Sequence, residues 1–165
     1  MKRGDLPVGP VGLPEGYSVR PYRDGDWAGW CRCLIGGGLG VTEIDKTKFD
    51  AIMAADKTVE LKNILFLTAP DGRAVGTLTC QYRDDPGERN VHMFGVAEGY
   101  RGKGLSAPML RYALRRMIAE GVRVFYLTTD DWRVPAIKTY LRCGFEPVII
   151  GGDAADRWRA LLDGE

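Results

Sequence analysis

The chain alternates between short apolar runs and amphipathic segments, and this pattern predicts a mixture of strands and helices. Apolar runs bounded by turn residues are typical of strands, and apolar residues three and four positions apart are typical of helices. The predicted strands are residues 17–26, two strands within 64–83, 91–97, 122–131 and 146–150. The predicted helices are residues 26–36, 45–56, 105–121, 134–145 and about 153–163.

The order of these segments predicts a mixed sheet. Two apolar stretches flank Pro70-Asp71-Gly72, a turn sequence, and so indicate an antiparallel hairpin. Residues 91–129 follow a strand–helix–strand order, and strands joined in this way are parallel. We therefore expect antiparallel strands early in the chain and one parallel pair later.

Length and charge limit the classes of protein that remain. The chain has 165 residues and a formal net charge of +1, which suits one domain with no overall field that favours nucleic acid or a membrane. Residues 1–15 are predicted to be a flexible lead-in rich in proline and glycine, followed by one domain over residues 16–165. Without an apolar signal core in the lead-in, we expect a cytoplasmic protein.

The cysteines do not predict a metal site. A single Cys-x-Cys pair, Cys31 and Cys33, is joined by isolated Cys80 and Cys143, and the lone histidine, His92, is distant in sequence. Structural zinc sites show two spaced pairs of ligands. We therefore expect reduced, mostly buried thiols and no metal.

The stretch "GVAEGYRGKGLSAPMLRYAL" carries the first indication of chemistry. Gly102 and Gly104 lie between an apolar strand and a helix, beside the cations Arg101 and Lys103. Backbone without Cβ atoms at a helix N-terminus can approach an anion closely. The loop lacks the spacing of a P-loop or of a dinucleotide fingerprint. On these residues alone it is either a phosphate site or a tight basic turn.

Two motifs in register make the sequence resemble the GNAT N-acetyltransferase superfamily. Arg101, Gly104 and Ser106 occupy the signature places of Arg/Gln-x-x-Gly-x-Gly/Ala. A later family helix is matched by Ala136, Ile137, Tyr140, Gly144 and Phe145. The chain departs from the family pattern in three places, where Ser106 replaces glycine or alanine, Arg133 replaces asparagine, and a helix follows Ile150.

The resemblance implies an α/β fold with a mixed, mostly antiparallel sheet, a splayed parallel strand pair and helices on both faces. It also implies acetyl-CoA, or another acyl-CoA, as the donor and an amine as the acceptor. The two parallel strands are expected to part after about Phe94. The residues implied in cofactor binding are Phe94, Val96, Arg101, Gly102, Lys103, Gly104, Leu105, Ser106 and Arg133.

The implied reaction needs a proton donor and a proton acceptor. Tyr140 is the candidate acid, although a tyrosine at this helical spacing can equally be a core residue. His92 is the candidate base, because its ordinary pKa is close to neutrality and it shares strand parity with Phe94 and Val96. Glu88 and the adjacent Asp130 or Asp131 are weaker rivals for the base, and Glu98 lies at the entry of the phosphate loop, a poor position for one.

The resemblance also bears on the acceptor pocket, the reaction and the assembly of the protein. The resemblance places the acceptor pocket at the first two helices, where Trp27, Trp30 and "IGGGLG" could shape a cleft or merely pack in the core. The expected function is transfer of an acetyl group to a primary amine. The alternative is a non-catalytic module that binds acyl-CoA. A homodimer is possible, with the C-terminal helix as one contact.

Overall fold

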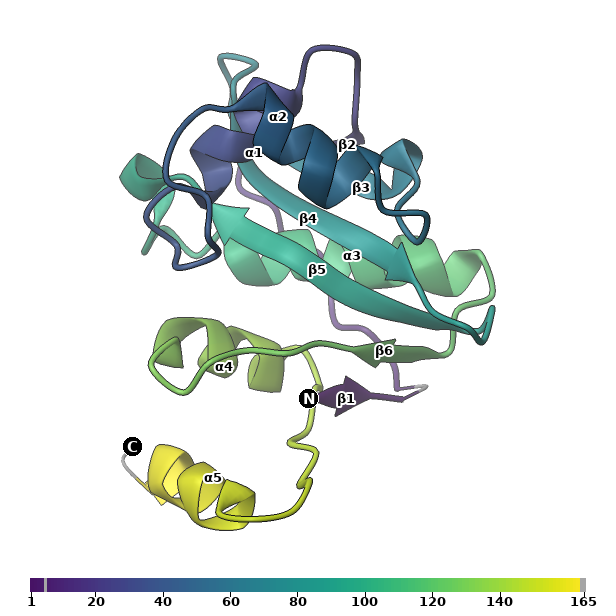
Figure 1. Ribbon diagram of the computed structural model, residues 1–165, viewed down its shortest axis with the longest axis vertical. Helices are drawn as coiled ribbons and strands as arrows, with labels where there is room; N and C mark the ends of the chain where they lie inside the picture. Colours follow the sequence, from purple (N-terminus) through teal and green to yellow (C-terminus); the bar gives the residue numbers. More distant parts are fainter. Residues whose placement is uncertain (5, 164–165) are drawn as a thin grey trace.

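A six-stranded sheet forms the centre of the protein (Figure 1). The computed structural model describes residues 1–4 and 6–163, so the last two residues of the predicted domain lie outside the described part. The strands lie in the order β1-β6-β5-β4-β3-β2. Their bounds are Lys2–Arg3 (β1), Ser18–Pro21 (β2), Ile64–Thr68 (β3), Ala74–Tyr82 (β4), Glu88–Val96 (β5) and Val124–Tyr126 (β6).

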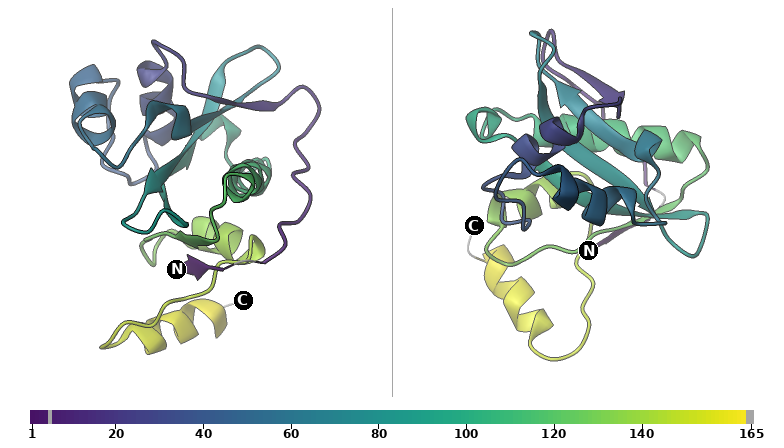
Figure 2. Two further views of the ribbon diagram at one scale, coloured as in Figure 1. Left: turned by 90° about the vertical axis from the view of Figure 1, so that its right-hand side faces the viewer. Right: turned by 45° about the horizontal axis from the view of Figure 1, so that its top comes forward.

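Helices cover both faces of this sheet (Figure 2). The helices are α1 (Trp27–Leu34), α2 (Lys46–Phe49), α3 (Ser106–Ala119), α4 (Val134–Arg142) and α5 (Ala154–Asp163). A π-helical turn, Asp50–Ala54, continues α2, and short 3-10 turns occupy Leu61–Asn63 and Glu98–Tyr100. We call the two sides the α1 face and the α3 face. Among the strands of the described residues only β5 and β6 pair in parallel, so the predicted mixed, mostly antiparallel sheet is confirmed.

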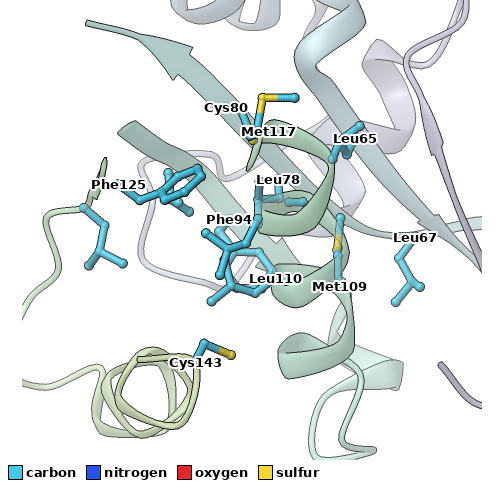
Figure 3. Close-up of a cluster of buried hydrophobic side chains, with 14 of the residues drawn as sticks. Leu65, Leu67, Leu78, Cys80, Phe94, Met109, Leu110, Met117, Phe125 and Cys143 are labelled. Atoms are coloured by element: carbon cyan, nitrogen blue, oxygen red, sulfur yellow. The ribbon is translucent and has the colours of Figure 1, made fainter. Parts of the chain in front are cut away.

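Each face has its own apolar core. On the α3 face, Leu110 and Met117 of α3 pack against strand residues such as Leu78 and Phe125 (Figure 3). On the α1 face, Trp30 of α1 packs with residues from α2, β3 and β5. Burying one such side chain contributes about 1.5–3 kcal/mol, so the two cores hold the helices firmly against the sheet.

A bulge in β5 sets which side chains face which core. Thr77 of β4 lies opposite Gly95, but Thr79 lies opposite His92, so β5 has one residue more than β4 between these pairs. Met93 takes a φ of 47°, in the left-handed region that non-glycine residues rarely enter. The extra residue reverses the alternation of side chains along the strand. The expectation that His92 shares parity with Phe94 and Val96 is therefore wrong.

The parallel strands part earlier than expected. β5 and β6 pair only from Glu88 opposite Val124 to Asn90 opposite Tyr126, and beyond these residues they diverge. The sequence placed the divergence after about Phe94. The bulge at Met93 supplies the reason, because bulges bend a strand and increase its twist.

The edge beyond β6 differs most from expectation. Lys2–Arg3, part of the predicted lead-in, pairs with β6, so the sheet extends outside the predicted boundary at residue 16. Arg3 is buried, and its guanidinium donates to the carbonyls of Cys143 (2.9 Å), Gly4 (3.0 Å) and Pro7 (3.2 Å), and to that of Leu6. These bonds hold the N-terminal segment against the end of α4.

The strand predicted at residues 146–150 does not form. Glu146 makes a single bridge to Lys2, with backbone bonds of 2.9 and 2.8 Å. Val148, Ile149 and Ile150 are exposed. The physical reason is that β1 already occupies the edge beside β6, so the segment after Glu146 leaves the sheet and leads to α5.

Candidate functional site

A cavity of about 700 Å³ lies where β5 and β6 have parted, on the α3 face. Its walls come from the end of β5, the loop before α3, and α4 with the residue before it. Most predicted cofactor residues line it: Phe94, Val96, Arg101, Gly102, Gly104, Ser106 and Arg133, together with Tyr140. The structure therefore brings together two motifs that are about 30 residues apart in sequence.

The loop before α3 presents unpaired amides to this cavity. Gly102 and Gly104 have φ of 74° and 72°, a conformation that glycine adopts without strain. In the described part of the chain, no amide of residues 102–107 donates to a backbone carbonyl. α3 begins at Ser106, so the partial positive charge of a helix N-terminus adds to these donors. The arrangement suits an anionic group such as a diphosphate.

The Arg101 side chain is engaged with the protein. Its Nε donates to the carbonyl of Val96 at 2.9 Å, and its Nη atoms donate to the carbonyls of Ile35 (2.7 Å) and Gly36 (3.2 Å). The guanidinium thus ties the α3 loop to the glycine-rich loop that follows α1. The positive charge of the Arg101 guanidinium therefore lies beside the cavity. The hydrogen-bond donors that face a bound anion would be the backbone amides of the loop.

Two predicted residues do not line the cavity with their side chains. Lys103 lies over the ring of Tyr100, with its Nζ 4.8 Å from the ring centroid. Leu105 is buried in the core of the α3 face. Any contact of either residue with a ligand in the cavity would therefore come from its backbone.

The backbone of Val96 faces the gap between the strands. The amide of Ala97 donates to the carbonyl of Val75 on β4 at 2.9 Å. In an antiparallel pair such bonds alternate along the strand, so the N–H and C=O of Val96 point away from β4. The carbonyl accepts from Arg101, and the N–H is left directed toward the cavity.

Tyr140 is both a core residue and a lining residue of the cavity, the two positions that the sequence left open for it. Its ring packs in the core, 6.2 Å from the ring of Phe94 and 6.0 Å from that of Phe145, yet it also lines the cavity. Its hydroxyl has no hydrogen-bond partner within the described residues. Burial raises the pKa of Tyr140, and the nearby charge of Arg133 opposes this only in part. The phenol therefore stays protonated at neutral pH.

His92 lies on the α1 face, opposite the side that carries Tyr140, and it is half-buried. Burial lowers the pKa of His92, and the carboxylate of Asp56 acts against this. The imidazole is therefore neutral at pH 7 and able to take up a proton.

The rival carboxylates are engaged or remote. Glu88 accepts from the hydroxyl of Tyr126 (3.1 Å) and from Arg83 (3.1 Å). Arg157 of α5 binds both carboxylate oxygens of Asp131. Glu98, at the start of a 3-10 turn, and Asp130, in the loop after β6, are both exposed.

The glycine-rich loop after α1 reaches the other wall of the site. Gly37 lines the cavity, and a Cβ on Gly38 would lie 2.0 Å from the indole of Trp132. Trp132 therefore packs directly on Gly38 across the gap. Trp30 is fully buried, so of its two predicted roles, shaping a cleft or packing in the core, the structure shows core packing. Trp132 is not among the residues predicted from the sequence, where its one signal is its position beside Arg133.

The cysteines carry no chemistry at this site. Cys31, Cys33, Cys80 and Cys143 are free and buried. Burial raises the pKa of Cys33 and of Cys80 to about 12, so these thiols are not nucleophilic at neutral pH. Among the described residues, no cluster of three metal-ligating side chains occurs, and no helix has the length and apolarity to cross a bilayer.

Known structures share this fold. A GCN5-related N-acetyltransferase from Sphaerobacter thermophilus superposes with a TM-score of 0.69 at 20% identity, over 88% of this chain and 46% of that one. AAC(6')-Iy in complex with the bisubstrate analogue CoA-S-monomethyl-acetylneamine superposes with a TM-score of 0.61 at 17% identity, over 82% and 97% of the two chains.

Sequence comparison agrees with the fold. The mycothiol acetyltransferase of Corynebacterium aurimucosum is 36% identical over 78 residues, which are 47% of this chain and 26% of that protein. That of Corynebacterium glutamicum is 30% identical over 83 residues, or 50% and 28%. The chain thus matches only about a quarter of the length of these relatives. The model of the acetyltransferase (GNAT) family matches residues 43–145, and the chain belongs to this family.

Proposed function

We propose that this protein is an N-acetyltransferase that uses acetyl-CoA to acetylate a primary amine. The observation that carries the proposal is the convergence, on one cavity, of the unpaired amides before α3, the N–H of Val96 and the hydroxyl of Tyr140. The mycothiol acetyltransferase relatives, and the AAC(6')-Iy structure with its CoA conjugate, support the same reaction class.

The donor would bind by two kinds of contact. The amides of residues 102–107 would hold the diphosphate, with the charges of Arg101 and Arg133 nearby. The exposed edge of β5 would hold the pantetheine arm, which can pair with backbone groups as an added strand does. The parted strands leave Val96 unpaired by β6 and so leave room for this arm.

In the proposed acetyl transfer, the proton acceptor and the proton donor lie on opposite faces of the sheet. The amine nitrogen attacks the thioester carbonyl, a C–N bond forms, and the C–S bond breaks to release the thiolate of CoA. The N–H of Val96 would polarise the carbonyl oxygen. Neutral His92 would accept the proton lost by the ammonium on the α1 face. Tyr140, on the opposite side, would protonate the thiolate.

The test is binding followed by turnover. Calorimetry should show that acetyl-CoA binds, and a free-thiol release assay over a panel of amines should show transfer. Tyr140→Phe should lower turnover by about 10²–10⁴-fold, the usual contribution of a general acid, and should keep acetyl-CoA binding. Binding without thiol release from any amine would instead identify a non-catalytic acyl-CoA-binding module.

A further inference from the structure

A second cavity, of about 520 Å³, adjoins the point where β5 and β6 part. Asn90 and Tyr126, the last paired residues of the two strands, line it. Asn90 shares the α1 face with His92, because the two are separated by one residue before the bulge. Asn90 therefore places this cavity on the same face of β5 as His92, although His92 is not among its lining residues.

A chain of hydrogen bonds fixes the orientation of the Asn90 side chain. The carboxylate of Asp56 can only accept, and Gln81 Nε2 donates to its Oδ2 at 2.9 Å. The Gln81 Oε1 atom must then face Asn90, whose Nδ2 donates to it at 3.0 Å. The Oδ1 atom of Asn90 has no hydrogen-bond partner among the described residues, and Asn90 lines the cavity. Asp56 thus acts through Gln81 to present Asn90 as a hydrogen-bond acceptor.

Other groups around the cavity also offer acceptor oxygens. The hydroxyl of Tyr126 gives its proton to Glu88, so its oxygen keeps its lone pairs. Thr129 Oγ1 is buried without a partner among the described residues, and Thr129 lines the cavity. The Thr129 hydroxyl can pair with a donor or an acceptor, but a ligand that satisfies the oxygens of Asn90 and Tyr126 must carry hydrogen-bond donors.

The outer wall is α5 and the segment that leads to it. Val148, Ile150 and Trp158 contribute apolar surface. Arg157 fastens the helix to the loop after β6, with its Nε 2.7 Å and its Nη2 3.0 Å from the two carboxylate oxygens of Asp131. The wall therefore depends on an ion pair between two segments that are distant in sequence.

We propose that this cavity receives the amine acceptor, and that Asn90 determines specificity by accepting a hydrogen bond from a second donor group of that amine. The inference rests on the proposed function and names the substrate class: a small primary amine that carries a further hydroxyl or amino group. Residues two apart on a strand lie about 7 Å from each other, so the second donor lies a few bonds from the nitrogen that reacts beside His92. The volume suits a small molecule of this kind.

The first experiment compares three amines of equal chain length: butylamine, 4-amino-1-butanol and 1,4-diaminobutane. Thiol release should show that kcat/KM for the two bifunctional amines exceeds that for butylamine by about tenfold, the value of one net hydrogen bond. Asn90→Leu should abolish this preference and leave the KM for acetyl-CoA unaltered. If Asn90→Leu does not fold, Asn90→Ser carries the same test.

The second experiment uses a matched pair on α5. Arg157→Ala should raise the KM for 4-amino-1-butanol severalfold, because the wall loses its tie to Asp131, and should spare the KM for acetyl-CoA. Arg159 lies two residues on, pairs with Asp156 and does not line the cavity, so Arg159→Ala should leave both constants unchanged. A preference that survives in the Asn90 variants, or equal effects of the two arginine variants, overturns the inference. Failure of the wild type to acetylate any amine overturns the proposed function itself.

Discussion

Gly95 is the position at which a single methyl group should test how the site is held together. It lies on β5 directly beneath α1, and a Cβ there would lie 2.7 Å from Leu34 Cδ2 and 2.9 Å from the carbonyl oxygen of Cys33. Both distances fall below the 3.4 Å at which ordinary van der Waals contact begins. The φ of Gly95 is not positive, so Gly95→Ala introduces a steric conflict and no strain in φ.

The size of the effect follows from what has to move. The Leu34 methyl group could rotate away, but the Cys33 carbonyl is part of the backbone of α1. The helix must therefore shift by roughly half an ångström, and overpacking of this kind costs about 1–3 kcal/mol. Gly99 is the matched control, since a Cβ there meets nothing within 4 Å and its φ is ordinary. Gly99→Ala should be neutral or stabilising by about 0.4–1 kcal/mol.

Gly95→Ala should weaken ligand binding at the cavity as well as lower the free energy of unfolding. α1 leads into Ile35 and Gly36, whose carbonyls hold the Arg101 guanidinium, so a displaced helix also displaces the loop before α3. Urea denaturation should show the loss of unfolding free energy in Gly95→Ala, and calorimetry should show weaker acetyl-CoA binding. Leu34→Ala in the Gly95→Ala background should not restore the stability, because the Cys33 carbonyl stays in place and a fully buried leucine is lost. Equal stability of the Gly95 and Gly99 variants would refute this reasoning.

Three further predictions concern the titrating groups and the N-terminal strand. Because burial lowers the pKa of His92, kcat/KM should rise with pH and level off with a midpoint below 6.5, and an unaltered profile in His92→Gln would exclude it as the base. Because burial raises the pKa of Tyr140, the alkaline limb should lie above pH 10, and Tyr140→Phe should remove that limb. Arg3→Ala should cost at least about 2 kcal/mol in urea denaturation, since a buried carbonyl left without a donor costs about 1–3 kcal/mol; a loss below 0.5 kcal/mol, on the order of a surface substitution, would contradict this.

Local signals were sufficient for most elements. Pro70-Asp71-Gly72 predicts the β3–β4 hairpin because each of these residues favours a turn conformation. Gly102 and Gly104 predict the loop at the start of α3, where the observed positive φ values require glycine. These predictions hold because they depend on backbone preferences of a few consecutive residues.

Pairing at the sheet edge could not be predicted in the same way. Lys2 and Arg3 show no alternation, and they become a strand only because β6 offers a free edge and the carbonyls around Arg3 need donors. Residues 146–150 have strong strand character, yet only Glu146 pairs. Which segment takes an edge depends on competition between distant parts of the chain.

The sequence by itself determined the order of most elements, the glycine-rich loop before α3 and the two family motifs, because these depend on short stretches of residues. Only the tertiary structure decided that His92 and Tyr140 lie on opposite sides of the sheet, and that Asn90 presents an acceptor oxygen. Both outcomes depend on the register of β5, and therefore on one extra residue between its pairs with β4. A bulge of this kind arises from packing against α1 and from pairing with β4, which no local pattern of residues specifies.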